Sequence, residues 1–199
     1  PFVLQGNQGH SQKGSRPGNA SYYYSFTRMK TKGVLKIQGT PFQVQGHSWM
    51  DREWSTSALE EGQIGWDWFA LQLSDGREVM LYQIRLENGK PDSTSKGVVV
   101  DQNGKTTPLN WTDLKLEVLG SWTSPETGVQ YPSGWTLSIP SENLNFQINP
   151  LIENQELRTS LKYWEGAVEV VTLLDQRKKA GRGYVCLLYT SPSPRDDEL

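Results

Sequence analysis

The chain contains few cysteine and histidine residues, and its net charge is close to zero. Its 199 residues include one cysteine, Cys186, and two histidines, His10 and His47, and the formal net charge is −2. A single cysteine excludes an intramolecular disulfide, and so few Cys and His residues argue against a zinc site of the usual kind. Binding to nucleic acid or to an anionic membrane needs a clear excess of Lys and Arg, so neither is expected as a partner.

Long apolar runs and common catalytic motifs are absent as well. No run approaches the roughly 20 apolar residues of a membrane-spanning helix, so no integral membrane span is expected. The sequence has no Gly-x-Ser-x-Gly element for a serine nucleophile, and the Gly-rich stretch at residues 5–14 lacks the spacing of a phosphate-binding loop. We therefore expect neither a metal nor a cofactor.

The chain is rich in aromatic residues and in tight-turn signals. Eight Trp and eight Tyr residues occur in a chain that is only 35% hydrophobic, which is typical of a β-protein with an aromatic core or an aromatic ligand cavity. Strand-like runs at residues 64–73 and 78–86 flank an Asp-Gly turn at residues 75–76, and two Asn-Gly turns follow. The pattern predicts an all-β fold, an antiparallel barrel or sandwich.

The distribution of these runs predicts two β-domains. Residues 22–54 hold about three strands, fewer than the roughly eight that a small closed barrel needs, and the strands after them supply most of a second barrel. The expected division is 1–58 for the end of a first domain and 59–185 for a second. Residues 5–20 are expected to form a long loop, and only residues 153–160 are suited to a short helix.

The last segment differs in character from the rest. From Cys186 the sequence reads CLLYTSPSPRDDEL, and CLLYTSPSPRD is what a common transposon-type sequencing adapter encodes in one reading frame. Such added segments are set aside in reasoning about a fold. We therefore expect residues 186–199 to be a non-native tail, and the chain to be a piece of a longer protein that is truncated at both ends.

Six segments carry a resemblance to a known family. They are ASYYYSFTRMKTKG, GHSWMDREWSTS, GWDWFALQLSDGREVMLYQIR, SWTSPETGVQYPSGW, YWEGAVEV and GRGYV, in this order. The chain resembles the lipocalin-like carotenoid 1,2-hydratase and AttH family, whose members are often labelled predicted secreted hydrolases. The resemblance implies two consecutive lipocalin-like (calycin) antiparallel barrels, the first only partly present, and a periplasmic or secreted location. Because one fold hosts several chemistries, it does not select the reaction.

The stretch HSWMDREW is the leading candidate for a functional site. Side chains alternate along a strand, so Trp49, Asp51 and Glu53 share one face. A carboxyl group desolvated in an aromatic cavity has a raised pKa and is able to protonate an alkene carbon, after which water captures the cation. In the hydratase branch of the family the catalytic aspartate corresponds to Asp51, an aromatic residue to Trp49, and an imidazole and an indole to Tyr22 and Tyr24. The tyrosines at these two positions differ from the imidazole and the indole of the hydratase branch.

A structural interpretation of the same residues stays open. Asp51 and Glu53 are equally suited to pair with an arginine and to fix a domain junction, and Glu53 is assigned to structure rather than to chemistry. The segment GWDWF puts Trp66 and Trp68 on one face, either in a core or against a ligand, and its Asp67 is expected to be buried and paired.

Two functions therefore remain. The first is an enzyme, a carotenoid 1,2-hydratase-like hydro-lyase that hydrates or isomerises a hydrophobic isoprenoid or polyene-like small molecule, with Asp51 as proton donor. The second is a carrier of the cell envelope that binds such a molecule without turnover. An Asp51 in a cavity without a basic partner favours the enzyme; an Asp51 held by an arginine favours the carrier. The side chains expected around the ligand are Tyr22, Tyr24, Trp49, Glu53, Trp66 and Trp68.

Overall fold

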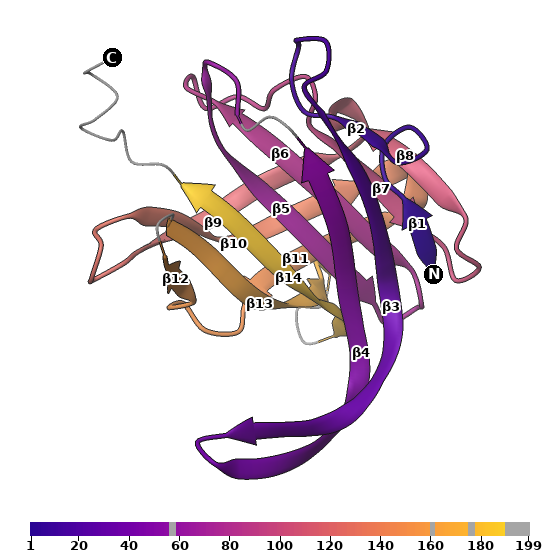
Figure 1. The fold of residues 1–199 in the computed structure, drawn as a ribbon, viewed down its shortest axis with the longest axis vertical. Helices are drawn as coiled ribbons and strands as arrows, with labels where there is room; N and C mark the ends of the chain where they lie inside the picture. Colours follow the sequence, from indigo (N-terminus) through magenta and orange to yellow (C-terminus); the bar gives the residue numbers. More distant parts are fainter. Residues whose placement is uncertain (56–58, 160–161, 175–177, 190–199) are drawn as a thin grey trace.

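Two β-sheets make up nearly all of the structure, a computed structural model that describes residues 1–55, 59–159, 162–174 and 178–189 (Figure 1). Sheet A is formed by β1 (Phe2–Leu4), β2 (His10–Gln12), β3 (Ala20–Ile37) and β4 (Thr40–Ser55). Sheet B, with strand order β8-β7-β6-β5-β14-β13-β11-β10-β9, is formed by β5 (Gln63–Leu73), β6 (Glu78–Leu86), β7 (Lys96–Val100), β8 (Thr106–Asn110), β9 (Lys115–Thr123), β10 (Gln130–Ile139), β11 (Leu144–Pro150), β13 (Lys162–Thr172) and β14 (Lys179–Tyr189).

Short elements complete the fold. Strand β12 (Glu156–Arg158) pairs with β13, and the 3-10 turns η1 (Trp111–Asp113) and η2 (Pro140–Glu142) precede β9 and β11. Every strand pair is antiparallel in the part of the chain that the structure describes, as the alternating runs and tight turns predict. At the predicted Asp-Gly turn between β5 and β6, Gly76 has φ +88°, a conformation that glycine adopts without strain.

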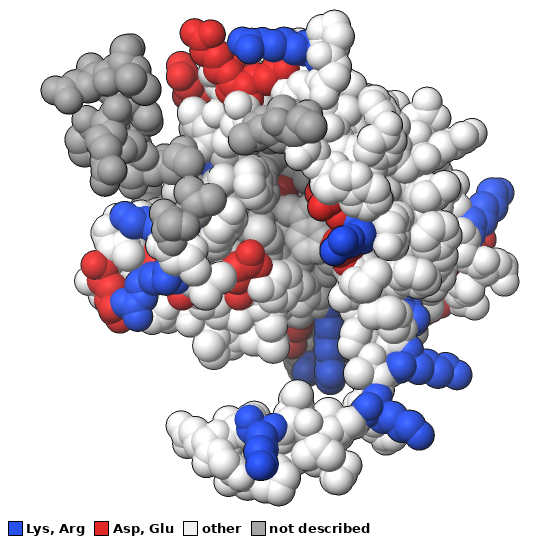
Figure 2. Space-filling model, viewed as in Figure 1, with Lys and Arg blue, Asp and Glu red and all other residues white. Residues whose placement is uncertain are grey.

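Strands β3 and β4 form one long hairpin whose far end projects from the body of the molecule (Figure 1). Its two turn residues, Gln38 and Gly39, both have positive φ, which matches the twist of the strands they join. Nearer the body the register shifts between Phe26 and Met29, so the side-chain alternation changes phase there. The far part carries Lys side chains and, over residues 29–50, no Asp or Glu (Figure 2).

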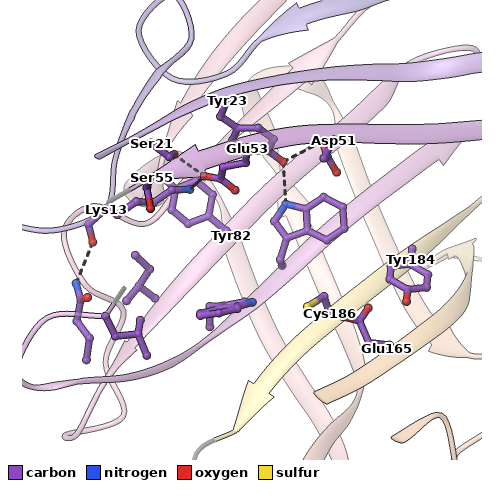
Figure 3. Close-up of a pocket in the computed structure, with 15 residues that line it drawn as sticks. Lys13, Ser21, Tyr23, Asp51, Glu53, Ser55, Tyr82, Glu165, Tyr184 and Cys186 are labelled. Atoms are coloured by element: carbon purple, nitrogen blue, oxygen red, sulfur yellow. Dashed lines mark hydrogen bonds and ion pairs between the residues drawn. The ribbon is translucent and has the colours of Figure 1, made fainter. Parts of the chain in front are cut away.

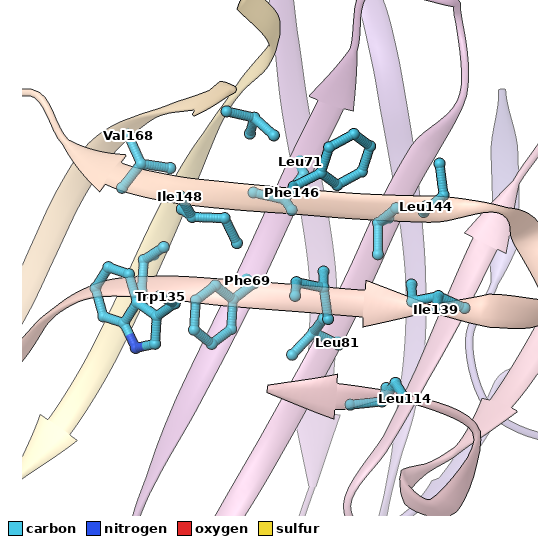
Figure 4. Packing of buried hydrophobic residues seen from close by; sticks show 14 of the residues in the cluster. Phe69, Leu71, Leu81, Leu114, Trp135, Ile139, Leu144, Phe146, Ile148 and Val168 are labelled. Carbon is cyan, nitrogen blue, oxygen red and sulfur yellow. The ribbon is translucent and has the colours of Figure 1, made fainter. Parts of the chain in front are cut away.

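Sheet B curls around an apolar core (Figure 4). Phe69 of β5 meets Trp135 of β10 edge to face at 5.4 Å between ring centroids, and Trp135 lies 6.3 Å from Trp164 of β13. All three side chains are fully buried. Strands from both halves of the sheet therefore contribute to one core, and we call the face of sheet B that borders it the inner face and the opposite one the outer face.

Three expectations about local structure are wrong. Residues 156–158 form β12, not a helix, because the edge of β13 offers backbone partners to an extended chain. The segment 5–20 is not a loop throughout, since β2 pairs with β3. Residues 22–54 form two long strands rather than about three, because the bulge lets β3 bend without ending.

The expected boundaries stay predictions. Residues 56–58, next to the expected junction between the two domains, and residues 190–199, most of the expected non-native tail, lie outside the described residues. Cys186, where that tail is expected to begin, lies within β14, which pairs with β13 up to Leu188 and with β5 up to Tyr189.

Candidate active site between the two sheets

A pocket of about 460 Å³ lies between sheet A and the outer face of sheet B (Figure 3). Its volume is in the range of small-molecule sites. Sheet A contributes one wall and strands β5, β6, β13 and β14 the other, and Lys13 and Leu59 come from the segments that precede β3 and β5. The lining residues are Lys13, Ser21, Tyr23, Asp51, Glu53, Ser55, Leu59, Gln63, Trp66, Trp68, Tyr82, Ile84, Glu165, Tyr184 and Cys186.

Alternation along β5 places two tryptophans in this pocket. Trp66 and Trp68 are half-buried and line it, whereas Phe69 points to the core on the inner face. Asp67 also lies away from the pocket and is buried beside Arg85, with which it forms an ion pair. The two tryptophans are therefore pocket residues, and the expected burial and pairing of Asp67 are confirmed.

Asp51 faces the pocket from β4 and is held by neutral donors. The Tyr23 hydroxyl donates to Oδ1 at 3.0 Å, Ser25 Oγ donates to the same oxygen, and Trp49 Nε1 donates to Oδ2 at 2.9 Å. Among the described residues no Lys, Arg or His forms an ion pair with Asp51. Burial raises the pKa of this carboxyl above its usual value, against the lowering effect of the three hydrogen bonds, and the nearby charge of Glu53 raises it further.

Tyr23 connects Asp51 to the opposite wall. Trp68 Nε1 donates to the Tyr23 hydroxyl at 3.2 Å, and that hydroxyl in turn donates to Asp51. Burial and the charges of Asp51 and Glu53 raise the pKa of Tyr23 well above its usual value, so the phenol stays protonated and remains a donor. The chain Trp68–Tyr23–Asp51 fixes the orientation of the carboxyl group (Figure 3).

Glu53 has a different environment from Asp51. Lys13 Nζ lies 2.8 Å from Glu53 Oε1, and Ser21 Oγ donates to the same oxygen. The Lys13 ammonium also sits 4.1 Å from the centre of the Tyr82 ring. Glu53 is thus paired with a cation at the edge of the pocket, which agrees with its assignment to structure.

The far wall supplies a second carboxylate. Glu165 projects from β13 into the pocket, and the Tyr184 hydroxyl donates a hydrogen bond to it from the adjacent strand β14. Burial and this hydrogen bond raise the pKa of Tyr184, so Tyr184 keeps its proton. Glu165 stands out in the sequence only as part of YWEG, where a carboxylate follows two aromatic residues.

The structure corrects the placement of two predicted residues. Tyr22 and Tyr24 lie on the face of β3 that points away from Asp51, and Tyr22 is 61% exposed and packs against Trp54. Tyr23 occupies the pocket face instead, directly opposite Glu53 across the two strands. The error arises because the pairing of β3 with β4 decides which tyrosine faces the carboxylates, and the register shift in β3 cannot be read from spacing.

Two ion pairs formed by arginine stabilise the surroundings of the pocket. Arg28, on the β3 bulge, pairs with Glu78 of β6 and donates to the Leu73 carbonyl at 3.0 Å, so it ties the hairpin to sheet B. Arg85 pairs with Asp67 beneath the pocket wall. Arg28 and Arg85 are therefore paired with Glu78 and Asp67 and not with Asp51.

The described residues contain no group of three or more His, Cys, Asp or Glu side chains arranged to hold a metal ion. In the same part of the chain no helix is long and apolar enough to cross a membrane.

Comparison with known proteins decides the family. The sequence model of the AttH-like family matches residues 1–189. The chain belongs to the AttH-like family. The crystal structure of a candidate AttH protein from Nitrosomonas europaea superposes with a TM-score of 0.85 at 34% identity, covering 96% of this chain and 59% of that one. The match confirms the all-β, lipocalin-like class, and the presence of two barrels stays a prediction.

Two more distant matches are hydratases. A kievitone hydratase of Fusarium solani subsp. phaseoli is 22% identical over 181 residues, which is 86% of this chain and 50% of that protein. The crystal structure of a kievitone hydratase from Nectria haematococca has a TM-score of 0.73 at 22% identity, covering 96% of this chain and 58% of that one. The chain therefore spans between half and three fifths of the length of these relatives.

Proposed function

We propose that this AttH-like protein is a hydratase that adds water to a carbon–carbon double bond of a hydrophobic, isoprenoid or polyene-like small molecule. The observation that carries the proposal is the environment of Asp51, a buried carboxyl held by Tyr23, Ser25 and Trp49 in an aromatic pocket and without an ion-pair partner among the described residues. The distant likeness to a kievitone hydratase supports the same class of reaction.

Alkene hydration needs a group that is still protonated when the ligand binds. The pKa of Asp51 is raised by burial, so the carboxyl keeps its proton to a higher pH than an exposed aspartate does. Transfer of that proton to one alkene carbon leaves a cation on the other carbon, which water then captures. The activity of such an acid falls as the pH rises through its pKa.

The aromatic walls suit the charge that develops on the ligand. A cation close to the face of Trp66 or Trp68 is attracted by the negative face of the ring, and this attraction is stronger where water is excluded. The ground-state alkene carries no such charge, so the rings stabilise the transition state more than the bound ligand. The pocket thus combines an acid with an apolar, cation-stabilising wall.

The experiment is a hydration assay with a matched pair of variants. Purified protein is incubated with acyclic isoprenoids and polyenes, and products heavier by one water are sought by mass spectrometry. We expect Asp51→Asn to lower turnover by about 10²-fold or more, because a general acid contributes that much, while ligand affinity stays unchanged. The control is Glu87→Gln, an exposed carboxylate after β6, which is expected to leave turnover unchanged.

Three results are distinguishable. Hydration that is lost in Asp51→Asn and kept in Glu87→Gln supports the proposal. Ligand that binds but is recovered unchanged identifies a carrier instead, in which the carboxylates serve binding or structure alone. Hydration at an unchanged rate in Asp51→Asn removes Asp51 as the acid.

A further inference from the structure

We propose that Glu165 is the general base that takes a proton from the attacking water. The inference rests on the proposed hydration and adds a second catalytic residue to it. Adding water to an alkene moves two protons: one goes onto carbon, and one leaves the water oxygen once the C–O bond has formed. An acid and a base on opposite sides of the ligand accomplish both transfers without either group changing position.

The two carboxyl groups stand on different walls of one pocket. Asp51 belongs to β4 in sheet A, and Glu165 belongs to β13 in sheet B (Figure 3). The tryptophans of β5 belong to the same wall as Glu165. Glu165 is half-buried and its hydrogen-bond donor Tyr184 is neutral. Within the described residues no cation forms an ion pair with Glu165, which accepts hydrogen bonds from the Tyr184 hydroxyl and the Cys186 thiol. A carboxylate has about four acceptor sites on its two oxygens, so Glu165 keeps acceptor capacity for a water molecule.

The strand register places Glu165 relative to Trp68, which is linked to Asp51. Trp68, Cys186 and Glu165 are directly paired on β5, β14 and β13, so Glu165 lies two strands beyond Trp68. Neighbouring strands are about 4.8 Å apart, which puts Glu165 roughly 10 Å from Trp68 across the sheet. Trp68 reaches Asp51 through Tyr23. Asp51 and Glu165 both line the pocket of about 460 Å³, a volume in the range of small-molecule sites.

Glu53 is the other carboxylate in the pocket and is less suited to this role. Its Oε1 is engaged by Lys13 and by Ser21, and it stands two residues from Asp51 on the same strand. A base beside the acid would deliver water to the face of the alkene that receives the proton. Glu165 approaches from the opposite wall, so protonation and water attack occur on different faces of the alkene.

Atoms and electrons balance in the proposed hydration step. The Asp51 carboxyl gives its proton to one alkene carbon, and the π electrons form that C–H bond. The water oxygen forms a bond to the other carbon, and its proton passes to the Glu165 carboxylate. Asp51 ends as carboxylate and Glu165 as carboxylic acid, and exchange with solvent restores both. Neither an oxidant nor a cofactor takes part.

The test follows deuterium and oxygen separately, with geranylgeraniol in detergent as the probe and D₂O as the solvent. Asp51 exchanges its proton with solvent and places deuterium on carbon, whereas Glu165 acts only on the water. We expect Glu165→Gln to lower formation of the deuterated alcohol by about 10²-fold. Deuterated, double-bond-shifted alkene becomes the main product, because the cation still forms and loses a proton instead of gaining oxygen. Asp51→Asn is expected to lose both products.

Two further variants keep the test decisive. Glu169→Gln changes a carboxylate on the same face of β13 that pairs with Lys179 outside the pocket, and it is expected to behave as the wild type. Glu165→Asp keeps a carboxylate on a shorter side chain and is expected to restore part of the hydration. Circular dichroism melting curves establish that each variant is folded.

The outcomes separate this inference from the function on which it rests. Wild-type protein that forms neither the alcohol nor deuterated alkene overturns both. Wild-type hydration with an undiminished ratio of alcohol to shifted alkene in Glu165→Gln overturns the role of Glu165 and leaves Asp51 in place. Equal loss of both products in Glu165→Gln without recovery in Glu165→Asp also overturns it, since that pattern indicates a structural role.

Discussion

The two faces of sheet B differ in how they are filled. On the inner face Phe69, Leu71 and Trp135 are buried completely and pack into one continuous apolar core (Figure 4). On the outer face of the same strands Trp66 and Trp68 are half-buried and border the pocket of about 460 Å³ that also contains polar groups. One strand, β5, supplies large aromatic side chains to both.

The difference shows where ligand chemistry is possible in this fold. Side chains that fill the space inside the curl leave the inner face to stabilise the protein. The outer face of sheet B packs against sheet A through a small apolar cluster. Around Asp51 and Trp68 the two sheets are not in full contact, and the pocket lies there. The candidate site is therefore a space between two sheets, and the groups that hold the sheets together also shape the site.

The largest expected contrast is between two tryptophan truncations. Trp135→Ala leaves a large cavity in the core and should lower the free energy of unfolding by about 4 kcal/mol. Trp68→Ala removes a half-buried ring that also donates to Tyr23, so it should cost less stability but weaken binding of an apolar ligand by about tenfold. Denaturant unfolding and ligand titration measure the two quantities.

Two results would contradict the proposed difference between the inner and the outer face. A Trp135→Ala protein that is stable but no longer binds ligand would place the ligand inside the curl of sheet B. A Trp68→Ala protein that loses stability and keeps full affinity would show that Trp68 serves the apolar cluster between the sheets and not the ligand.

A smaller effect is expected at the one charged pair on the filled side of β5. Burial raises the pKa of Asp67 to about 6 despite the Arg85 guanidinium beside it. A raised pKa means that the folded protein binds this proton more tightly than the unfolded chain does, so the contribution to stability is present below pH 4 and is lost as the pH rises to about 6. The change from 3.8 to about 6 corresponds to about 3 kcal/mol.

The Asp67→Asn variant isolates this contribution because asparagine does not titrate. Relative to the wild type, its free energy of unfolding should rise by up to about 3 kcal/mol between pH 4 and pH 7. Urea unfolding at several pH values measures the difference. A relative stability that falls over this range would show that Arg85 holds the pKa of Asp67 below its usual value.

Features set by local sequence could be predicted from the sequence. The Asp-Gly turn before β6 was predicted, and its glycine adopts the positive φ that makes the dipeptide a turn signal. The common face of Trp49, Asp51 and Glu53 follows from alternation along a strand, and the structure confirms that Asp51 and Glu53 line one pocket while Trp49 donates to Asp51.

Features set by pairing and packing could not be predicted in this way. The choice of Tyr23 over Tyr22 depends on the register of β3 against β4, to which a bulge adds an offset. Whether Trp68 faces a core or a pocket depends on the second sheet, and alternation within β5 is the same in both cases. Lys13 reaches Glu53 across 40 residues of sequence that carry no local signal of the contact.

The most direct test of the central claim is a crystal structure of the protein with a bound isoprenoid such as geranylgeraniol. The account predicts ligand density between sheet A and the outer face of sheet B, with an alkene carbon close to the Asp51 carboxyl and the rings of Trp66 and Trp68 along the chain. Ligand density inside the curl of sheet B, or against Tyr22 and Tyr24 on the far face of β3, would contradict it.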